Sequence, residues 1–237
     1  MKLLRSCFVF AVLLIFTSLT AIANDNTSNK ADYKNFAIII SGPSGVGKTT
    51  LTNAFLARNK NINVAISATT RTKRGNEVDG KDYYFISKDS FKKLIEKGEF
   101  MEYDNYLENY YGSSIRFYVE SQTEGKDVIY NLTIKGMENA KKKHPEFDFV
   151  TIFIAPPSLD VLYQRLKNRN TDTEKQIKKR FLQAQKEMEY AKEYDYIVYN
   201  CNLDDTIKMI ETIYLAEQRK RELPKECFVD KRKFIFN

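Results

Sequence analysis

The chain contains few of the residues that build metal and redox centres. Among its 237 residues are one histidine, His144, and three cysteines, Cys7, Cys201 and Cys227. No C-x-x-C pair and no Cys/His cluster is present, so the sequence does not predict a zinc site. His144 lies in KKKHPEF, which is typical of a polar loop, and we do not expect it to be catalytic. A Cys201–Cys227 disulfide fits an oxidising compartment, but nothing in the sequence requires it.

The N-terminal apolar run is too short for a typical membrane span. CFVFAVLLIF (7–16) has ten residues, whereas a span needs about 20. Lys2 and Arg5 precede the run, and the small residues AIA (21–23) follow it. This pattern predicts a signal peptide over 1–23 with cleavage after Ala23, a linker over 24–35, and no stable membrane insertion after cleavage. An uncleaved anchor is the alternative.

The signal peptide predicts export, to a periplasm, the outside of the cell or an organelle; the protein stays cytoplasmic if the signal is not used. Net charge is +7. A basic tail over 218–237 carries seven Lys/Arg and three Asp/Glu, a net of +4. A solvated chain end is the favoured interpretation of this tail, and we expect no nucleic-acid partner.

Five short apolar runs predict strands. They lack polar alternation, as strands buried on both faces do, and they cover 36–41, 64–67, 127–132, 149–155 and 196–200. Helical patterns lie between them, so the sequence predicts an α/β fold with a mostly parallel sheet flanked by helices. Residues 68–118 break the rhythm and predict an insertion, with a short strand at 83–86.

Two of the helical patterns are specific enough to place. One follows a glycine-rich loop and contains Leu51, Phe55 and Leu56. A second has apolar residues at spacings of 3 and 4, and TDTE (171–174) before it predicts a capping box with Thr171 as the cap and Glu174 reaching back. The apolar positions of the second pattern are Ile177, Phe181, Ala184, Met188 and Ala191.

SGPSGVGKTTL (41–51) matches G-x-x-x-x-G-K-[ST], between an apolar strand pattern and a helical one. Backbone N–H groups of such a loop wrap phosphates, and the helix N-terminus adds a positive dipole end. The motif predicts a P-loop NTPase fold in which Lys48 reaches the β- and γ-phosphates and Thr49 ligates Mg²⁺. The predicted ATP contacts in the loop are Gly42, Ser44, Gly45, Val46, Gly47, Lys48, Thr49 and Thr50.

Two later segments offer groups that suit a nucleoside monophosphate. In SATTRTKRGNEVDGKDYYF (67–85), Arg71 and Arg74 can fork onto a phosphate and Tyr83 can donate a hydroxyl to it. FMEYDNYLENYYGSS (100–114) adds Glu102, whose carboxylate suits the adjacent N–H donors of guanine.

Together, GPSGVGKTT, S-x-TTR-x-x-R-x-x-E-x-x-G-x-DY-x-F, F-x-E with NYYGS, FIAPPS with RLKNRNTDTE, KRFLQAQKEM and YDYIVYN resemble guanylate kinase from about Phe36 to Glu217. The resemblance implies a domain over 36–217 with an NMP-binding insertion (66–118) and a mobile lid (156–180). It implies transfer of the ATP γ-phosphate to GMP or dGMP, with Mg²⁺. The sequence does not indicate an oligomeric state.

The resemblance also assigns roles. Lys48, Arg169 and Arg180 match catalytic positions, although a surface residue on a helix is the alternative for Arg180. Asn200 matches the asparagine near the adenine. The positions matched to GMP binding are Ser67, Arg71, Arg74, Glu77, Tyr83, Glu102, Tyr111, Ser113, Asn131 and Thr133.

The chain departs from the family pattern in YNLTIKG (130–136). Asn131 and Thr133 stand where the pattern has aspartates, Lys135 replaces a glutamine, and Cys201 replaces a later aspartate. Two lost charged hydrogen bonds predict activity reduced by about 10²- to 10⁴-fold if they add. Two alternatives therefore stay open: an exported pseudoenzyme that binds a nucleotide or phosphopeptide, and a kinase for another nucleoside monophosphate.

Overall fold

The computed structural model describes residues 34–168 and 173–223. The compact unit Asn35–Gln218 contains every described helix and strand in full except the last helix, which extends past Gln218. The predicted signal peptide, its cleavage site and Arg169 lie outside the described residues, as do most of the linker and of the basic tail. No helix in the described ranges is both long and apolar enough to cross a membrane.

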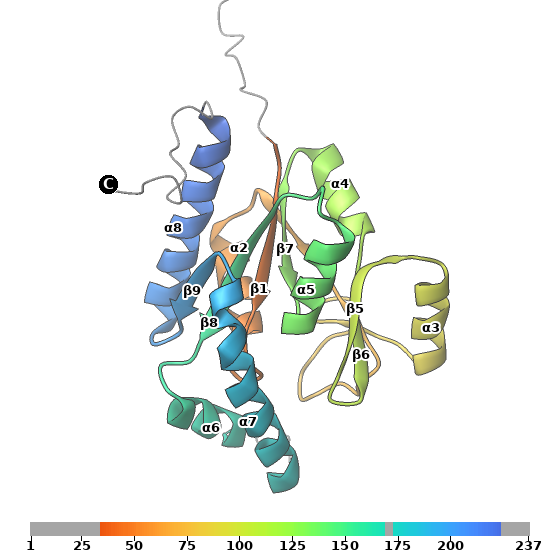
Figure 1. Cartoon of the computed structure of the whole chain (residues 1–237), viewed down its shortest axis with the longest axis vertical. Helices are drawn as coiled ribbons and strands as arrows, with labels where there is room; N and C mark the ends of the chain where they lie inside the picture. Colours follow the sequence, from red (N-terminus) through yellow and green to blue (C-terminus); the bar gives the residue numbers. More distant parts are fainter. Residues whose placement is uncertain (1–33, 169–172, 224–237) are drawn as a thin grey trace, which may run out of the picture. The chain divides into compact units, whose positions relative to one another are not determined.

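A five-stranded sheet forms the centre of this unit (Figure 1). Its order is β2-β7-β1-β8-β9 and all its pairings are parallel, which confirms the predicted fold class. The strands are β1 (Ala37–Ser41), β2 (Ile62–Ala65), β7 (Asp127–Asn131), β8 (Phe149–Ala155) and β9 (Tyr196–Tyr199). The sequence placed all five, but β2 lies two residues earlier than the predicted run.

Helices cover both faces of this sheet, which is why its strands are mostly apolar. Every residue of β1 is buried. Ala37 and Ile39 belong to a core with residues of α4 (Arg116–Glu124) and α5 (Ile134–Lys143). Phe55 of α2 (Lys48–Arg58) and Tyr214 of α8 (Leu203–Glu222) pack edge to face, with ring centroids 5.5 Å apart.

A second sheet occupies the stretch where the strand–helix rhythm breaks. Its order is β4-β3-β6-β5, and Phe91, Phe100 and Ala68 form a small core of its own. Its elements are β3 (Ala68–Thr69), β4 (Tyr84–Phe85), α3 (Lys88–Glu96), β5 (Phe100–Tyr106) and β6 (Asn109–Ser114). The short strand predicted at 83–86 is therefore present as β4.

The region predicted as a lid contains α6 (Leu159–Lys167) and the start of α7 (Glu174–Met188); η1 (Glu189–Glu193) follows. The capping-box prediction was wrong by two residues. Thr173 is the cap, it accepts the Gln176 N–H, and Gln176 Oε1 accepts the Thr173 N–H at 2.8 Å. The T-x-x-[EQ] pattern occurs twice here, and the second copy leaves Glu174 in the first turn, where the helix dipole favours an acid.

Two further expectations change with the structure. His144 is not in an open polar loop: it ends α5, is 9% exposed, and stacks on Phe147 with ring centroids 4.7 Å apart. Cys201 is an exposed thiol, and Cys227 lies outside the described residues, so their pairing stays a prediction.

Candidate active site

The phosphate loop connects β1 to α2. Gly42 has φ 147°, and a Cβ there would overlap the carbonyl oxygen of Ile154 in β8. Gly47 caps α2 with φ 104°, and no side chain caps the helix. The Lys48 ammonium donates to the carbonyl oxygens of Gly42 (2.6 Å) and Pro43 (3.2 Å). The loop thus presents an uncapped helix N-terminus and a cation together, the arrangement that binds phosphate.

Behind the loop, Asn200 supports its backbone. The Asn200 side-chain amide donates to the Val46 carbonyl at 2.7 Å, and Arg165 donates to the Asn200 carbonyl at 3.0 Å. Asn200 and Val46 are both buried and do not line the cavity next to the loop. The predicted contact of Asn200 with an adenine stays a prediction.

Asn131 lies at the end of β7, beside the end of β1, where Ile40 is its register partner. Its side-chain oxygen accepts the Thr52 hydroxyl proton at 2.9 Å, so its amide faces the first turns of α2. Thr49, one helical turn earlier, is exposed and lines the cavity.

On the insertion, Arg71 forms a two-pronged pair with Glu77. Both of its N···O distances to Glu77 are 2.6 Å, and its guanidinium lies 5.0 Å from the centre of the Tyr83 ring. Burial is the largest single influence and opposes both charges, but the hydrogen bonds and the surrounding charges together outweigh it, so the pKa of Arg71 is raised and that of Glu77 is lowered. Glu77 also accepts the Arg74 backbone N–H at 2.8 Å, which ties the two arginines to one turn.

Glu102 supplies a carboxyl group to the buried end of the same region. It is 4% exposed, and burial, followed by the charge of Asp104, raises the pKa of Glu102 to about 8. Ser113, its neighbour across the sheet, shares a 2.6 Å hydrogen bond with Ser67. Gly136 in α5 leaves room for the carboxyl group, since a Cβ there would be 2.5 Å from Glu102 Oε2.

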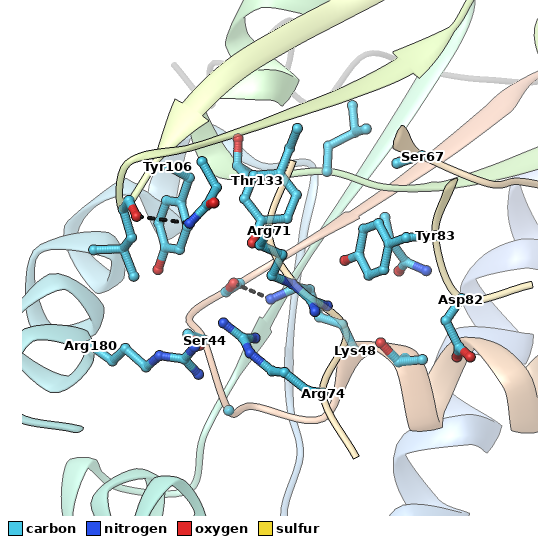
Figure 2. A pocket seen from close by; sticks show the side chains of 18 of the residues that line it. Ser44, Lys48, Ser67, Arg71, Arg74, Asp82, Tyr83, Tyr106, Thr133 and Arg180 are labelled. Atoms are coloured by element: carbon cyan, nitrogen blue, oxygen red, sulfur yellow. Dashed lines mark hydrogen bonds between the residues drawn. The ribbon is translucent and has the colours of Figure 1, made fainter. Parts of the chain in front are cut away.

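These parts face one cavity of about 750 Å³, within the size range of small-molecule sites. Figure 2 shows Lys48, Arg71, Arg74 and Arg180 pointing into it. Buried Ser113 lies behind its wall. The predicted residues that line it are Gly42, Ser44, Gly45, Gly47, Lys48, Thr49, Thr50, Ser67, Arg71, Arg74, Glu77, Tyr83, Glu102, Tyr111, Asn131, Thr133 and Arg180.

Helix α7 contributes one predicted and one unpredicted side chain. Arg180 is 6% exposed and lines the cavity, so the surface alternative for it was wrong. Glu187, two turns later and equally buried, also lines the cavity, and burial raises its pKa although Lys48 opposes the shift. The inward face of α7 thus follows Ile177, Arg180, Ala184 and Glu187 instead of the purely apolar stripe.

Tyr106 and Asp104 were also missed by the sequence reasoning. Both follow Glu102 at two-residue intervals along β5, which places all three on one face of the strand. Tyr106 lines the cavity. The alternation was a usable signal, but the tyrosine-rich stretch around it hid the strand.

Comparison with known proteins agrees with this geometry. The profile of the guanylate kinase family matches residues 34–217. A guanylate kinase from Caldanaerobacter subterraneus subsp. tengcongensis is 40% identical over 84% of this chain and 92% of its own, and one from Rickettsia felis is 42% identical over 79% and 96%. The crystal structure of guanylate kinase from Anaplasma phagocytophilum superposes with a TM-score of 0.65 at 28% identity, covering 80% of this chain and 89% of that one. The chain therefore belongs to the guanylate kinase family.

Proposed function

We propose that this nucleoside monophosphate kinase transfers the γ-phosphoryl group of ATP to GMP or dGMP, giving ADP and GDP or dGDP. The observation that carries the proposal is the single cavity lined both by the phosphate loop and by the Arg71–Arg74 turn. A donor and an acceptor phosphate can meet in such a cavity. The match to guanylate kinases over most of the chain supports the choice of nucleotides.

The chemistry asks for alignment and positive charge more than for a base. An oxygen of the GMP phosphate, already ionised, attacks the γ-phosphorus, and the bond from that phosphorus to the ADP oxygen breaks. Lys48 and Arg180 stabilise the charge on the transferring group. Arg169, which lies outside the described residues, is proposed to join them. Closure of the lid region would exclude water from this step.

Acceptor recognition divides into a phosphate end and a base end. Arg71, Arg74, Tyr83 and Tyr111 are proposed to hold the GMP phosphate, with Glu77 fixing the two arginines in place. At the other end of the cavity, Ser67 and Glu102 are proposed to contact guanine.

Mg²⁺ fits this site as an ion that arrives with ATP. The described residues contain no group of three or more His, Cys, Asp or Glu side chains placed to hold a metal. The Thr49 hydroxyl and the Asn131 amide oxygen are hard oxygen donors of the kind that Mg²⁺ accepts beside phosphate oxygens and water. When bound, Mg²⁺ neutralises charge on the β- and γ-phosphates.

The neutral side chains of Asn131 and Thr133 favour a second candidate, a binding protein that holds nucleotides without turnover. A coupled ADP-release assay with GMP, dGMP, AMP and UMP separates the two. We expect turnover with GMP and dGMP, and a loss of at least about 100-fold in Lys48→Met, because that variant lacks a charge on the transferring phosphate. Calorimetric GMP binding without any turnover would select the binding protein, and turnover confined to AMP or UMP would select another acceptor.

The N-terminal segment supports a separate proposal, that the protein is exported and loses residues 1–23. Fractionation of the producing cells, with the mass of the mature N-terminus, tests it. A full-length protein confined to the cytosol would contradict export.

A further inference from the structure

Two hydrogen bonds fix the orientation of the Thr133 hydroxyl group. It caps α5 by accepting the Gly136 N–H at 2.9 Å, and it donates its own proton to Asp104 Oδ2 at 2.9 Å. A hydroxyl has one proton to donate and two lone pairs. A backbone N–H can only donate and a carboxylate can only accept, so these two partners fix the direction of the proton. One lone pair of Thr133 is left, and Thr133 lines the cavity.

The Thr133 oxygen lies next to the Glu102 carboxyl group. A Cβ built on Gly136 would be 2.5 Å from Glu102 Oε2 and 3.1 Å from Thr133 Oγ1, so both oxygens approach the same point at the start of α5. The cavity therefore has two acceptors side by side. Guanine presents two adjacent donors on one edge, N1–H and the 2-amino group, whereas hypoxanthine has N1–H alone.

Asp104 accepts the Thr133 hydroxyl proton, which leaves the Thr133 oxygen able to accept from a group in the cavity. It lies on the same face of β5 as Glu102 and Tyr106, is half-buried, and does not itself line the cavity. Without this carboxylate the Thr133 proton could turn toward the cavity, and the hydroxyl would then oppose a ligand amino group instead of accepting from it. The predicted GMP site included Thr133 but gave no role to Asp104.

We propose that Asp104 is a positioning residue of the base subsite: by taking the Thr133 hydroxyl proton it fixes the Thr133 oxygen as an acceptor for the 2-amino group of guanine. This inference rests on the proposed function. It makes Asp104 and Thr133 a unit that discriminates guanine from hypoxanthine.

The test compares GMP with IMP as acceptor for the purified full chain. Asp104→Ala should lower the ratio of kcat/KM for GMP to that for IMP by about three- to tenfold, the scale of one hydrogen bond. The change should appear in KM for GMP, with kcat within about twofold, because the contact is equally strong in ground and transition states. The charge of Asp104 also acts on Glu102, but Glu102 faces N1–H of both substrates, so that effect cancels in the ratio.

Three further variants separate positioning from a structural tie. Asp104→Asn keeps an oxygen for the Thr133 proton and should retain the wild-type ratio. Asp104→Ala combined with Thr133→Ala should be no less selective than Asp104→Ala alone, because the two residues act as one unit. Asn139→Ala removes a different side-chain link between α5 and β5, the 2.9 Å bond to the Tyr103 carbonyl, and should leave the ratio unchanged.

An unchanged ratio in folded Asp104→Ala overturns the proposal, as does an equal fall in Asp104→Asn or Asn139→Ala. Thermal melts establish that each variant is folded. A wild-type protein that neither binds nor phosphorylates GMP would overturn the proposed function and this inference with it. A wild type that phosphorylates GMP while the variant ratios stay level would refute the role of Asp104 alone.

Discussion

Glu102 places a carboxyl group where water barely reaches it, and this gives GMP binding a pH dependence. Its pKa of about 8 means that the group is protonated in the empty protein at pH 7. Guanine brings N–H donors, which require the ionised form. Binding should therefore lower the pKa of Glu102 and release close to one proton at pH 7, and GMP affinity should rise from pH 6 toward pH 8.

Calorimetry of GMP binding in two buffers of different ionisation enthalpy measures that proton. The Glu102→Gln variant has no group to titrate at this position and is the matched control; its affinity should be weaker and should rise less over the same pH range, because only the phosphate of GMP then titrates. Binding enthalpies that do not depend on the buffer in the wild type would show that Glu102 is already ionised or does not contact the base.

Asn131 allows a gain-of-function prediction. The Asn131→Asp variant keeps an oxygen to accept the Thr52 hydroxyl proton and adds a charge beside Thr49. We expect kcat to rise about tenfold and the Mg²⁺ concentration for half-maximal rate to fall, since a charged acceptor is stronger by about 1.5 kcal/mol. Initial rates across a Mg²⁺ titration measure both, with Thr52→Val as the control for the shared hydrogen bond. An unchanged Mg²⁺ dependence would place Asn131 away from the metal.

At the scale of the elements, α7 shows why polar residues can occupy an inward face. Arg180 and Glu187 take inward positions that an apolar stripe would fill, because this part of the helix faces the cavity and not the core. Arg180→Ala should lower kcat by about 10²- to 10³-fold with KM for GMP within a few-fold, the loss typical of one charge that acts on the transition state.

Lys178→Ala is the matched control for Arg180, because Lys178 is an exposed cation on the same helix and does not line the cavity. Steady-state kinetics with varied GMP measure both variants. A large rise in KM for GMP, with kcat retained, would assign Arg180 to acceptor binding instead.

Elements were predictable from the sequence where one local signal decides them. The apolar run 149–155 matches β8 residue for residue, because a strand buried on both faces needs no partner information to be recognised. The cap of α7 was misplaced because two equivalent motifs overlap there. The alternation along β5 could place Asp104 on the face of Glu102, but the roles of Asp104 and Glu187 could not be predicted locally. They depend on the hydrogen bond of Asp104 with Thr133 and on the charge of Lys48 acting on Glu187, and both partners lie far away in the chain.

At the scale of the whole Asn35–Gln218 unit, the phosphate loop and Asn131 lie at the carboxyl ends of β1 and β7, and the insertion and α7 complete the cavity there. Parallel α/β sheets offer this edge for ligands because the loops that follow their strands converge there. The opposite ends of the same strands contribute to stability. Asp127, at the start of β7, is 2% exposed and ties together three elements.

Substitution of Asp127 should therefore lower the stability of the fold without changing the cavity. Its carboxylate accepts the Phe36 N–H at 3.0 Å, the Tyr214 hydroxyl at 2.9 Å and the Gln218 amide at 3.3 Å. Asp127→Ala leaves the buried Phe36 N–H and Tyr214 hydroxyl without this acceptor, and we expect the free energy of unfolding to fall by about 3 kcal/mol. Urea titration measures this, and KM for GMP should not change below the transition. Glu193→Ala, which removes an exposed carboxylate, should shift stability by less than about 0.5 kcal/mol. An equal effect of the two variants would mean that Asp127 does not hold β1, β7 and α8 together.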